Sequence, residues 1–122
     1  MRKQSEAEST PESQELLRIA EVIKKGTEAV ISKAQRCIPI KTTLFYEVSV
    51  TIALQQNGGQ SPLFFNPELG SSWVATSREE LFNPAVIAPH IAKIVEAYQT
   101  EILAAKDVAF NIQFGKVKNP HL

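Results

Sequence analysis

The chain has 122 residues, of which 43% are hydrophobic, and this size and composition suit one domain with its own core. Thirteen Lys and Arg residues balance thirteen Asp and Glu residues, so the chain lacks the basic excess that is typical of nucleic-acid-binding proteins. No segment approaches the roughly 18 consecutive apolar residues of a membrane span, and the opening residues lack the apolar run of a secretory signal.

The first element expected is a long amphipathic helix. Residues 1–9 are polar and charged and predict a disordered tail, and Thr10-Pro11 then resembles a hydroxyl N-cap followed by proline at the first helical position. Gly26 interrupts the pattern and indicates either close packing or a bend. Apolar residues recur at three- and four-residue spacing as far as Arg36, namely Leu16, Ile19, Ala20, Ile23, Val30, Ile31 and Ala34.

The segment from Leu44 to Gln56 predicts the longest strand. Its even-numbered residues are all apolar and its odd-numbered residues are mostly polar or small, so one face is expected to pack on a core. Residues 57–59, Asn-Gly-Gly, predict a turn. Residues 62–65 then suggest a short returning strand, and residues 66–70 suggest a second turn. Residues 72–76 could form a third strand.

A second amphipathic helix is expected to begin either at Asn83-Pro84 or at Pro89. Its apolar stripe consists of Ile91, Ile94, Val95, Tyr98, Ile102 and Leu103. A turn near Lys106-Asp107 and strict alternation over residues 108–114 predict a closing strand that buries Val108, Phe110, Ile112 and Phe114. Residues 118–122 predict a frayed tail.

This order of elements predicts an α+β fold with one domain over residues 10–117. Two amphipathic helices can cover one face of a sheet, which gives a two-layer sandwich. Both well-marked strands carry polar residues on their other side. We therefore expect a mostly antiparallel sheet of three or four strands with one face open, in the order α-β-β-(β)-α-β.

The open sheet face is the first candidate site. Its expected members are polar residues of the long strand and of the closing strand, namely Glu47, Ser49, Thr51, Asn111 and Gln113. Such a row offers donors, acceptors and one carboxylate to a partner or to a small polar ligand. The alternative interpretation is a solvated face or a surface for self-association.

An aromatic loop region over residues 60–82 is the second candidate. It contains Phe64, Phe65, Trp73 and Phe82 among many turn residues. Aromatic side chains bury a large area at a small entropic cost, so on loops they are favoured anchors for partners. The alternative interpretation is that they close the ends of the core.

Chemistry by a thiol is the third candidate. Cys37 follows a locally basic stretch, which can lower the pKa of a thiol, and His90 is an available base. Nothing in the sequence places the two together, and a buried, inert cysteine is the alternative. One cysteine excludes an internal disulfide, and with His90 and His121 it makes a poor ligand set for zinc. The sequence thus predicts no metal and no cofactor.

These observations favour a small noncatalytic module for protein interaction or regulation. Its partner would be another protein or a second copy of the chain, held by the open sheet face or by the aromatic loop region. Two alternatives remain open. One is a small-molecule-binding domain with its ligand between residues 60–82 and the sheet, and the other is a thiol-dependent enzyme using Cys37. Nucleic-acid binding and membrane association are not expected, and the single cysteine suits a reducing, cytoplasmic setting.

Overall fold

The computed structural model describes residues 11–41, 45–56 and 64–117. The predicted tails and the predicted turn at residues 57–59 lie outside this part of the chain. Within it, the elements follow in the order α2 (Pro11–Cys37), β1 (Phe45–Gln56), β2 (Phe64–Ala75), α3 (Arg78–Phe82), α4 (Pro84–Ala97), α5 (Gln99–Ala104) and β3 (Ala105–Val117).

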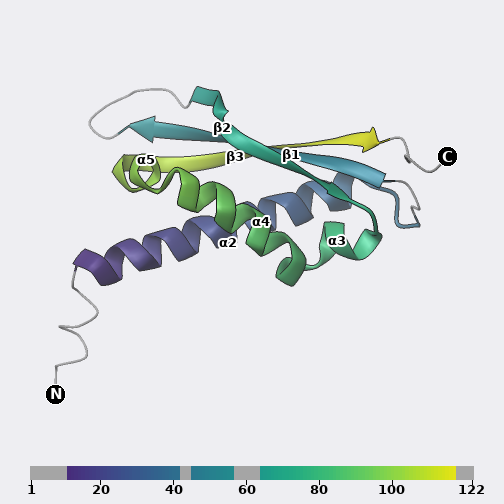
Figure 1. The fold of residues 1–122 in the computed structure, drawn as a ribbon, viewed down its shortest axis with the longest axis horizontal. Helices are drawn as coiled ribbons and strands as arrows, with labels where there is room; N and C mark the ends of the chain where they lie inside the picture. The colour runs from purple at the N-terminus through teal and green to yellow at the C-terminus, as the bar shows by residue number, and fades with distance from the viewer. Residues whose placement is uncertain (1–10, 42–44, 57–63, 118–122) are drawn as a thin grey trace, which may run out of the picture.

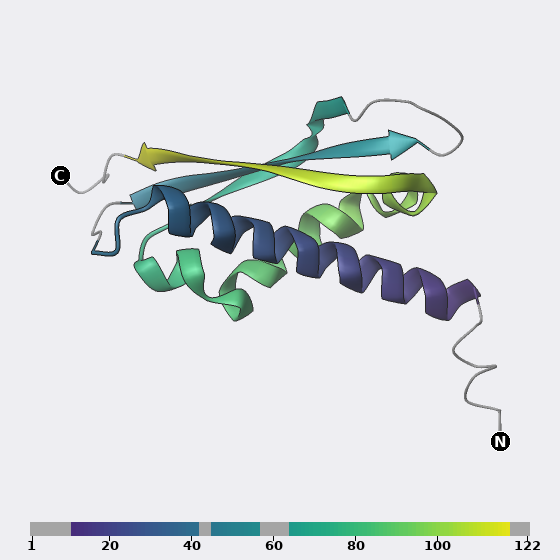
Figure 2. The same cartoon turned by 180° about the vertical axis from the view of Figure 1, so that it is seen from behind.

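The described strands form one antiparallel sheet in the order β2-β1-β3, with β1 at its centre. The helices all lie on one side of this sheet, and its other face carries none of them (Figures 1 and 2). The predicted α+β fold of two layers is therefore confirmed, with three strands.

The alternating pattern of β1 explains its central position. Val48, Val50 and Ile52 point into the helix layer and are at most 1% exposed, whereas Ser49 and Thr51 are half-buried on the opposite face. β3 repeats the alternation, since Val108 and Ile112 are buried while Phe110 and Phe114 pack at the margin of the core. Only the apolar face of this sheet has to be buried, because the small and polar side chains of the other face can remain in contact with water. One layer of helices is therefore enough.

Helix α2 uses a different stripe from the one expected at its start. Leu16 is 69% exposed and Ala20 is also exposed, so their predicted place in the core is wrong. The first turns of α2 project beyond the other helices (Figure 1). The stripe that is buried consists of Ile19, Val22, Val30 and Ala34, and it continues to Ile38 after the helix.

Gly26 marks close packing between α2, α4 and β3. A Cβ atom at this position would lie 2.8 Å from Cγ2 of Ile91 and 2.9 Å from Cζ of Phe110. Distances this short exclude a side chain unless its neighbours shift. The structure thus decides between the two interpretations of Gly26, and packing is the reason for the glycine.

β2 is one strand where the sequence suggested two short strands and a turn. Its pairing with β1 passes from Gly70 opposite Thr51 directly to Asn66 opposite Ile52, so residues 67–69 are extra on β2. Such a bulge suits Pro67, which cannot donate to a ladder. Gly70 follows where the backbones of β2 and β1 lie close together. A Cβ atom at Gly70 would lie 2.5 Å from the carbonyl oxygen of Val50.

The second helical region is divided into three helices. Ser77 caps α3 by accepting from the Glu80 N–H at 3.3 Å, and Asn83 caps α4 by accepting from the Ala85 N–H at 2.9 Å. Helix α4 therefore starts at Pro84, and Pro89 lies inside it. β3 begins directly after α5, at Ala105, so the expected turn at Lys106-Asp107 is wrong.

Candidate functional site

The polar residues predicted for the open sheet face lie next to one another. β1 and β3 pair antiparallel, which sets Ser49 opposite Gln113 and Thr51 opposite Asn111. Opposite residues of antiparallel strands have side chains on the same face, about 4.5–5.5 Å apart. Glu47 is the next outward residue along β1 and lies opposite Gly115.

β2 extends these pairs into three rows that cross the whole sheet. Ser49 also lies opposite Ser72, Thr51 opposite Gly70, and Glu47 opposite Val74. We call these nine residues the open face: Val74, Glu47 and Gly115; Ser72, Ser49 and Gln113; Gly70, Thr51 and Asn111. Among them only Glu47 carries a charge.

The side chains of the open face are small and accessible. Glu47, Ser72 and Gln113 are exposed, and Ser49, Thr51 and Asn111 are half-buried. The Ser72 hydroxyl donates to Oε2 of Glu47 at 3.4 Å, a long bond between two exposed groups that leaves both accessible to a partner. Val74 is a large apolar residue on the same face and is 47% exposed.

The open face ends at the following row. Ala53 is the next outward residue of β1, opposite Ala109, and its exposed fraction is 0%. Ala53 itself is therefore covered, whereas Ala109 opposite it is half-buried. Beyond this row Gln55 is half-buried and Asp107 opposite it is exposed, so polar groups of this face also reach solvent past Ala53.

Three of the four aromatic residues predicted as a loop cluster, Phe64, Phe65 and Trp73, belong instead to the sheet. Phe64 and Phe65 lie in β2, where their backbones pair with Leu54 and Ala53. Trp73, also in β2, lies opposite the buried Val48 and packs against the core from the helix side. Phe82 ends α3 and is half-buried, with the Arg78 guanidinium 4.5 Å from its ring centroid.

Trp73 forms a stack with His90 of α4. The two ring centroids are 4.4 Å apart and the planes differ by 2°. Burial lowers the pKa of His90 below its usual 6.5, and Lys93 lowers it further, while Glu80 acts in the opposite direction. Nε1 of Trp73 is buried, and no acceptor in the described part of the chain bonds to it. This stack was not anticipated from the sequence, where residues 73 and 90 fall in different predicted elements.

Cys37 and His90 occupy separate surroundings. Cys37 is exposed at the end of α2 and lines an open hollow, together with Ile38, Pro39, Tyr46, Phe114 and Lys116. This lining contains neither an imidazole nor a carboxylate that could accept the thiol proton. His90 is occupied by its stack with Trp73. Among the residues that the structure describes, the lining of this hollow supplies no base for a thiol nucleophile at Cys37.

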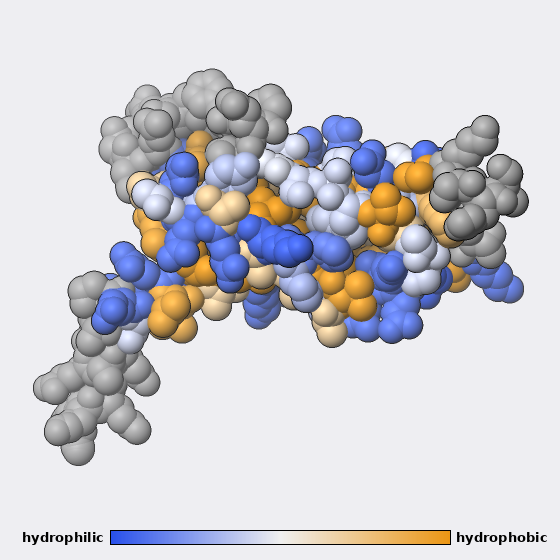
Figure 3. All heavy atoms as spheres, in the orientation of Figure 1, coloured by the Kyte–Doolittle hydropathy of each residue, from blue (hydrophilic) through white to orange (hydrophobic). Residues whose placement is uncertain are grey.

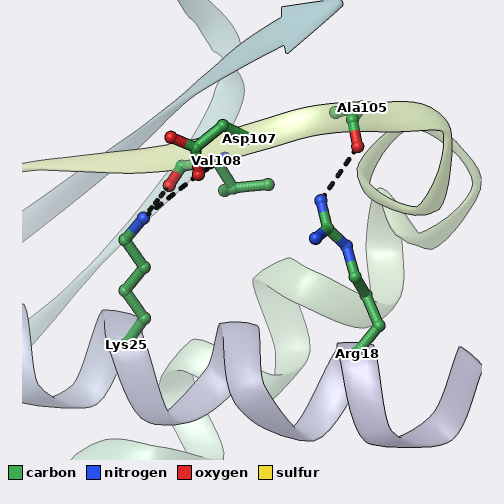
Figure 4. Close-up of polar contacts among 5 residues, drawn as sticks. All are labelled: Arg18, Lys25, Ala105, Asp107 and Val108. Carbon is green, nitrogen blue, oxygen red and sulfur yellow. Dashed lines mark hydrogen bonds and ion pairs between the residues drawn. The ribbon is translucent and has the colours of Figure 1, made fainter. Parts of the chain in front are cut away.

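A polar seam joins α2 to the start of β3 (Figure 4). Arg18 donates to the carbonyl oxygen of Ala105 at 2.9 Å, and Lys25 donates to that of Val108. Lys25 also lies 3.4 Å from Oδ1 of Asp107 in an exposed ion pair. Asp107 accepts from the Val108 N–H, and this bond, with a smaller effect of Lys25, lowers the pKa of its carboxyl. The seam fixes the direction of α2 along β3.

Four members of the open face were missed in the sequence: Gly70, Gly115, Ser72 and Val74. The last two lie close together on β2. They alternate with the inward Trp73 and Ala75, and this period of two is the signal that could have revealed them. The short length assigned to the third strand concealed it.

Figure 3 shows the side of the molecule seen in Figure 1, where hydrophobic residues form separate small patches among hydrophilic ones.

No protein-family model matches the chain, and neither the curated proteins nor the solved structures include a significant match. Among the residues that the structure describes, no helix has the length and apolar character needed to cross a membrane. The same residues contain no group of three or more His, Cys, Asp or Glu side chains arranged to hold a metal ion.

Proposed function

We propose that the chain is a noncatalytic protein-interaction module that binds its partner on the open face. The observation that carries this proposal is the uncharged surface that crosses all three strands, from Ser72 and Gly70 through Ser49 and Thr51 to Gln113 and Asn111. The centres of protein interfaces are depleted in Lys, Glu and Asp relative to other surface. The open face shares the low charge of such centres, with Glu47 at one end, but not their low serine content, since Ser49 and Ser72 lie in its middle row.

The shape of the surface also suits a protein partner. Three adjacent strands make a continuous sheet, and the small side chains of Ser49, Ser72 and Gly70 allow another surface to approach the backbone closely. The polar groups of Asn111 and Gln113 can each donate and accept hydrogen bonds, which supports specific recognition. Exposed Val74 adds apolar area beside them.

Photo-crosslinking in the native cell tests the proposal. A benzophenone amino acid is placed at Ser49 or Gln113 on the open face, and at Glu96 or Glu101 on exposed helix positions as matched controls. We expect one discrete protein adduct from both open-face positions and none from the helix positions, with the adduct identified by mass spectrometry. Equal labelling from both faces, or no adduct from the open face, would reject this function.

A charge placed in the open face provides the second arm. Ser49→Arg should abolish the adduct formed from Gln113, because a long charged side chain at the centre of the interface would hold the partner away from the sheet. Ser49→Thr, which keeps the hydroxyl, should leave it. Circular dichroism of both variants checks that the fold is retained. An adduct that survives Ser49→Arg would place the partner elsewhere.

A further inference from the structure

β3 leaves a long strand edge unpaired in the described structure. It bonds to β1 on one side only, and it runs for 13 residues from Ala105 to Val117. Natural edge strands are usually protected by proline, by bulges or by charges along their length. The opposite edge, β2, has such protection in Pro67 and its bulge.

The central part of β3 lacks these protections. Its register with β1 is regular from Asp107 to Val117, and residues 108–115 contain neither a charge nor a proline. Charges stand only near its ends, at Lys106, Asp107 and Lys116. An uncharged, regular edge of this length can template another strand.

We infer that the edge of β3 binds β3 of a second copy of this chain, antiparallel across a two-fold axis at Asn111. Asn111 is the central residue of β3, so pairing the strand with itself over its full length sets Asn111 opposite its own counterpart. Val108 then lies opposite Phe114 of the second copy, and Phe110 opposite Ile112. In this register, the helices of both copies lie on one side of a six-stranded sheet.

The charge along α2 favours a second copy over an unrelated strand. α2 runs in the same direction as β3, because Arg18 bonds to Ala105 at one end and Cys37 shares a hollow with Lys116 at the other. Residues 12–21 of α2 contain three glutamates and one arginine, whereas residues 22–37 contain four lysines or arginines and one glutamate. The two-fold axis makes the two α2 helices antiparallel, so the acidic half of each lies toward the basic half of the other.

Exposed apolar residues at the two ends of α2 also become complementary. Leu16 and Leu17 are 69% and 58% exposed at its start, and Ile40 is 75% exposed just beyond its end. The apolar hollow beside Ile38 and Phe114 opens at this same end. An antiparallel pair of α2 helices brings the leucines of one copy to the hollow of the other, and removes both from water at once.

The seam at the start of β3 is compatible with this pairing. Arg18 and Lys25 donate to the carbonyl oxygens of Ala105 and Val108. A carbonyl oxygen has two lone pairs, so each can accept a second hydrogen bond from the added strand. The Val108 N–H is donated to Oδ1 of Asp107, so this bond has to open where Val108 pairs with Phe114 of the second copy. The inference uses the edge of the sheet and the helix side and does not need a partner on the open face. Because Gln113 lies in the paired strand, a photo-adduct from Gln113 that contains a second copy of this chain supports the pairing and not the open-face partner.

Disulfide cross-linking tests the pairing at residue resolution. In a Cys37→Ser background, Asn111→Cys should form an intermolecular disulfide rapidly under mild oxidation, because opposite Cα atoms lie about 4.5–5.5 Å apart and a disulfide spans about 4.4–6.8 Å. Gln113→Cys is displaced from its own counterpart by four residues, roughly 13 Å. Gln113→Cys alone should therefore cross-link at least tenfold more slowly than Asn111→Cys. Mixed with Ala109→Cys it should cross-link rapidly, because residue 113 of one copy lies opposite residue 109 of the other.

Thr51→Cys is the matched control, because Thr51 lies opposite Asn111 on the same face but belongs to the central strand. Sedimentation of the wild-type chain should show a species of about 27 kDa, twice the 13.5 kDa of one chain. A monomer at every concentration up to about 1 mM would overturn the inference. A dimer that cross-links from Thr51→Cys or from Gln113→Cys alone, but not from Asn111→Cys, would also overturn it.

Charge reversal on α2 gives an arm that does not involve the sheet. Glu15→Lys with Glu21→Lys should raise the dissociation constant of the dimer about tenfold, because basic residues would then lie toward basic residues. Adding Lys33→Glu and Arg36→Glu should restore it. A dissociation constant that both changes leave unaltered would contradict the antiparallel α2 arrangement.

Discussion

The indole of Trp73 lies flat on the imidazole of His90, with centroids 4.4 Å apart, and this contact joins edge strand β2 to helix α4. Trp73 is the only tryptophan in the chain. We therefore expect its fluorescence to change when His90 is protonated, because the indole is in direct contact with the imidazole.

The first prediction concerns pH. Burial lowers the pKa of His90 in the folded state below its usual 6.5, so the unfolded chain binds the proton more tightly. His90 then contributes full stability above pH 6.5 and loses that contribution as pH falls through its lowered folded value. Urea unfolding at pH 7.5 and pH 5.5 measures the loss. His90→Phe should lose less stability between the two pH values than wild type.

His121→Gln is the control and should behave as wild type. A loss of stability in His90→Phe equal to that of wild type would refute the role of His90.

The second prediction concerns Gly26. Gly26→Ala gains about 1 kcal/mol of helix propensity but drives a methyl group against Ile91 and Phe110. Overpacking of this kind costs about 1–3 kcal/mol, so we expect net destabilisation in denaturant unfolding. Gly115→Ala is the control, because nothing lies within 4 Å of a Cβ atom there. A Gly26→Ala variant more stable than wild type would disprove the close packing.

The third prediction compares neighbours on β1. Ile52 is fully buried and Thr51 faces the open side, half-buried. Ile52→Ala should lower the free energy of unfolding by about 2–5 kcal/mol through a lost side chain and a cavity. Thr51→Ala should stay within about 0.5 kcal/mol. Similar losses at both positions would show that the second face of β1 is also covered.

The fourth prediction concerns the helix caps. Asn83→Ala removes the acceptor for the Ala85 N–H and should cost about 1 kcal/mol in thermal or urea unfolding. Asn83→Asp keeps an acceptor and should cost little. Ser77→Ala should cost less than Asn83→Ala, because its bond to the Glu80 N–H is longer at 3.3 Å. The reverse ranking would contradict the cap assignment at Asn83.

The fifth prediction separates the two contacts of Lys25. Asp107→Asn removes an exposed ion pair and replaces the carboxylate that accepts from the Val108 N–H by an amide oxygen. It should change stability by less than about 1 kcal/mol. Lys25→Met also removes the hydrogen bond to the Val108 carbonyl, and should cost about 1 kcal/mol more. Hydrogen exchange at the start of β3 should rise in Lys25→Met and not in Asp107→Asn. Equal exchange in the two variants would count against the bond to Val108.

Period-two and cap signals account for the parts of the fold that the sequence predicted well. The apolar residues Val48, Val50 and Ile52 predicted the buried face of β1. The matching alternation over residues 108–114 predicted strand β3. The grouping of Ser49 and Thr51 with Gln113 and Asn111 followed from these two patterns, and the β1–β3 register confirms that grouping. Whether these residues bind a partner stays a prediction.

The errors arise where tertiary context overrides local pattern. Leu16 has the spacing of a core residue, but α2 extends beyond the surface that would bury it. Residues 66–70 have turn chemistry, yet pairing on both sides of the bulge keeps β2 continuous. The stack of Trp73 on His90 depends on the approach of two elements, which no local spacing encodes.

The strand order β2-β1-β3 has a kinetic consequence. β1 can meet β2 across a short connection, but its other neighbour begins at Ala105, after three helices have intervened. Closing a loop of roughly 50 residues costs about 3.5 kcal/mol of chain entropy before any β1–β3 hydrogen bond compensates for it. We expect the docking of β3 to limit the folding rate, and mutations in β3 to alter refolding more than equally destabilising mutations in β2.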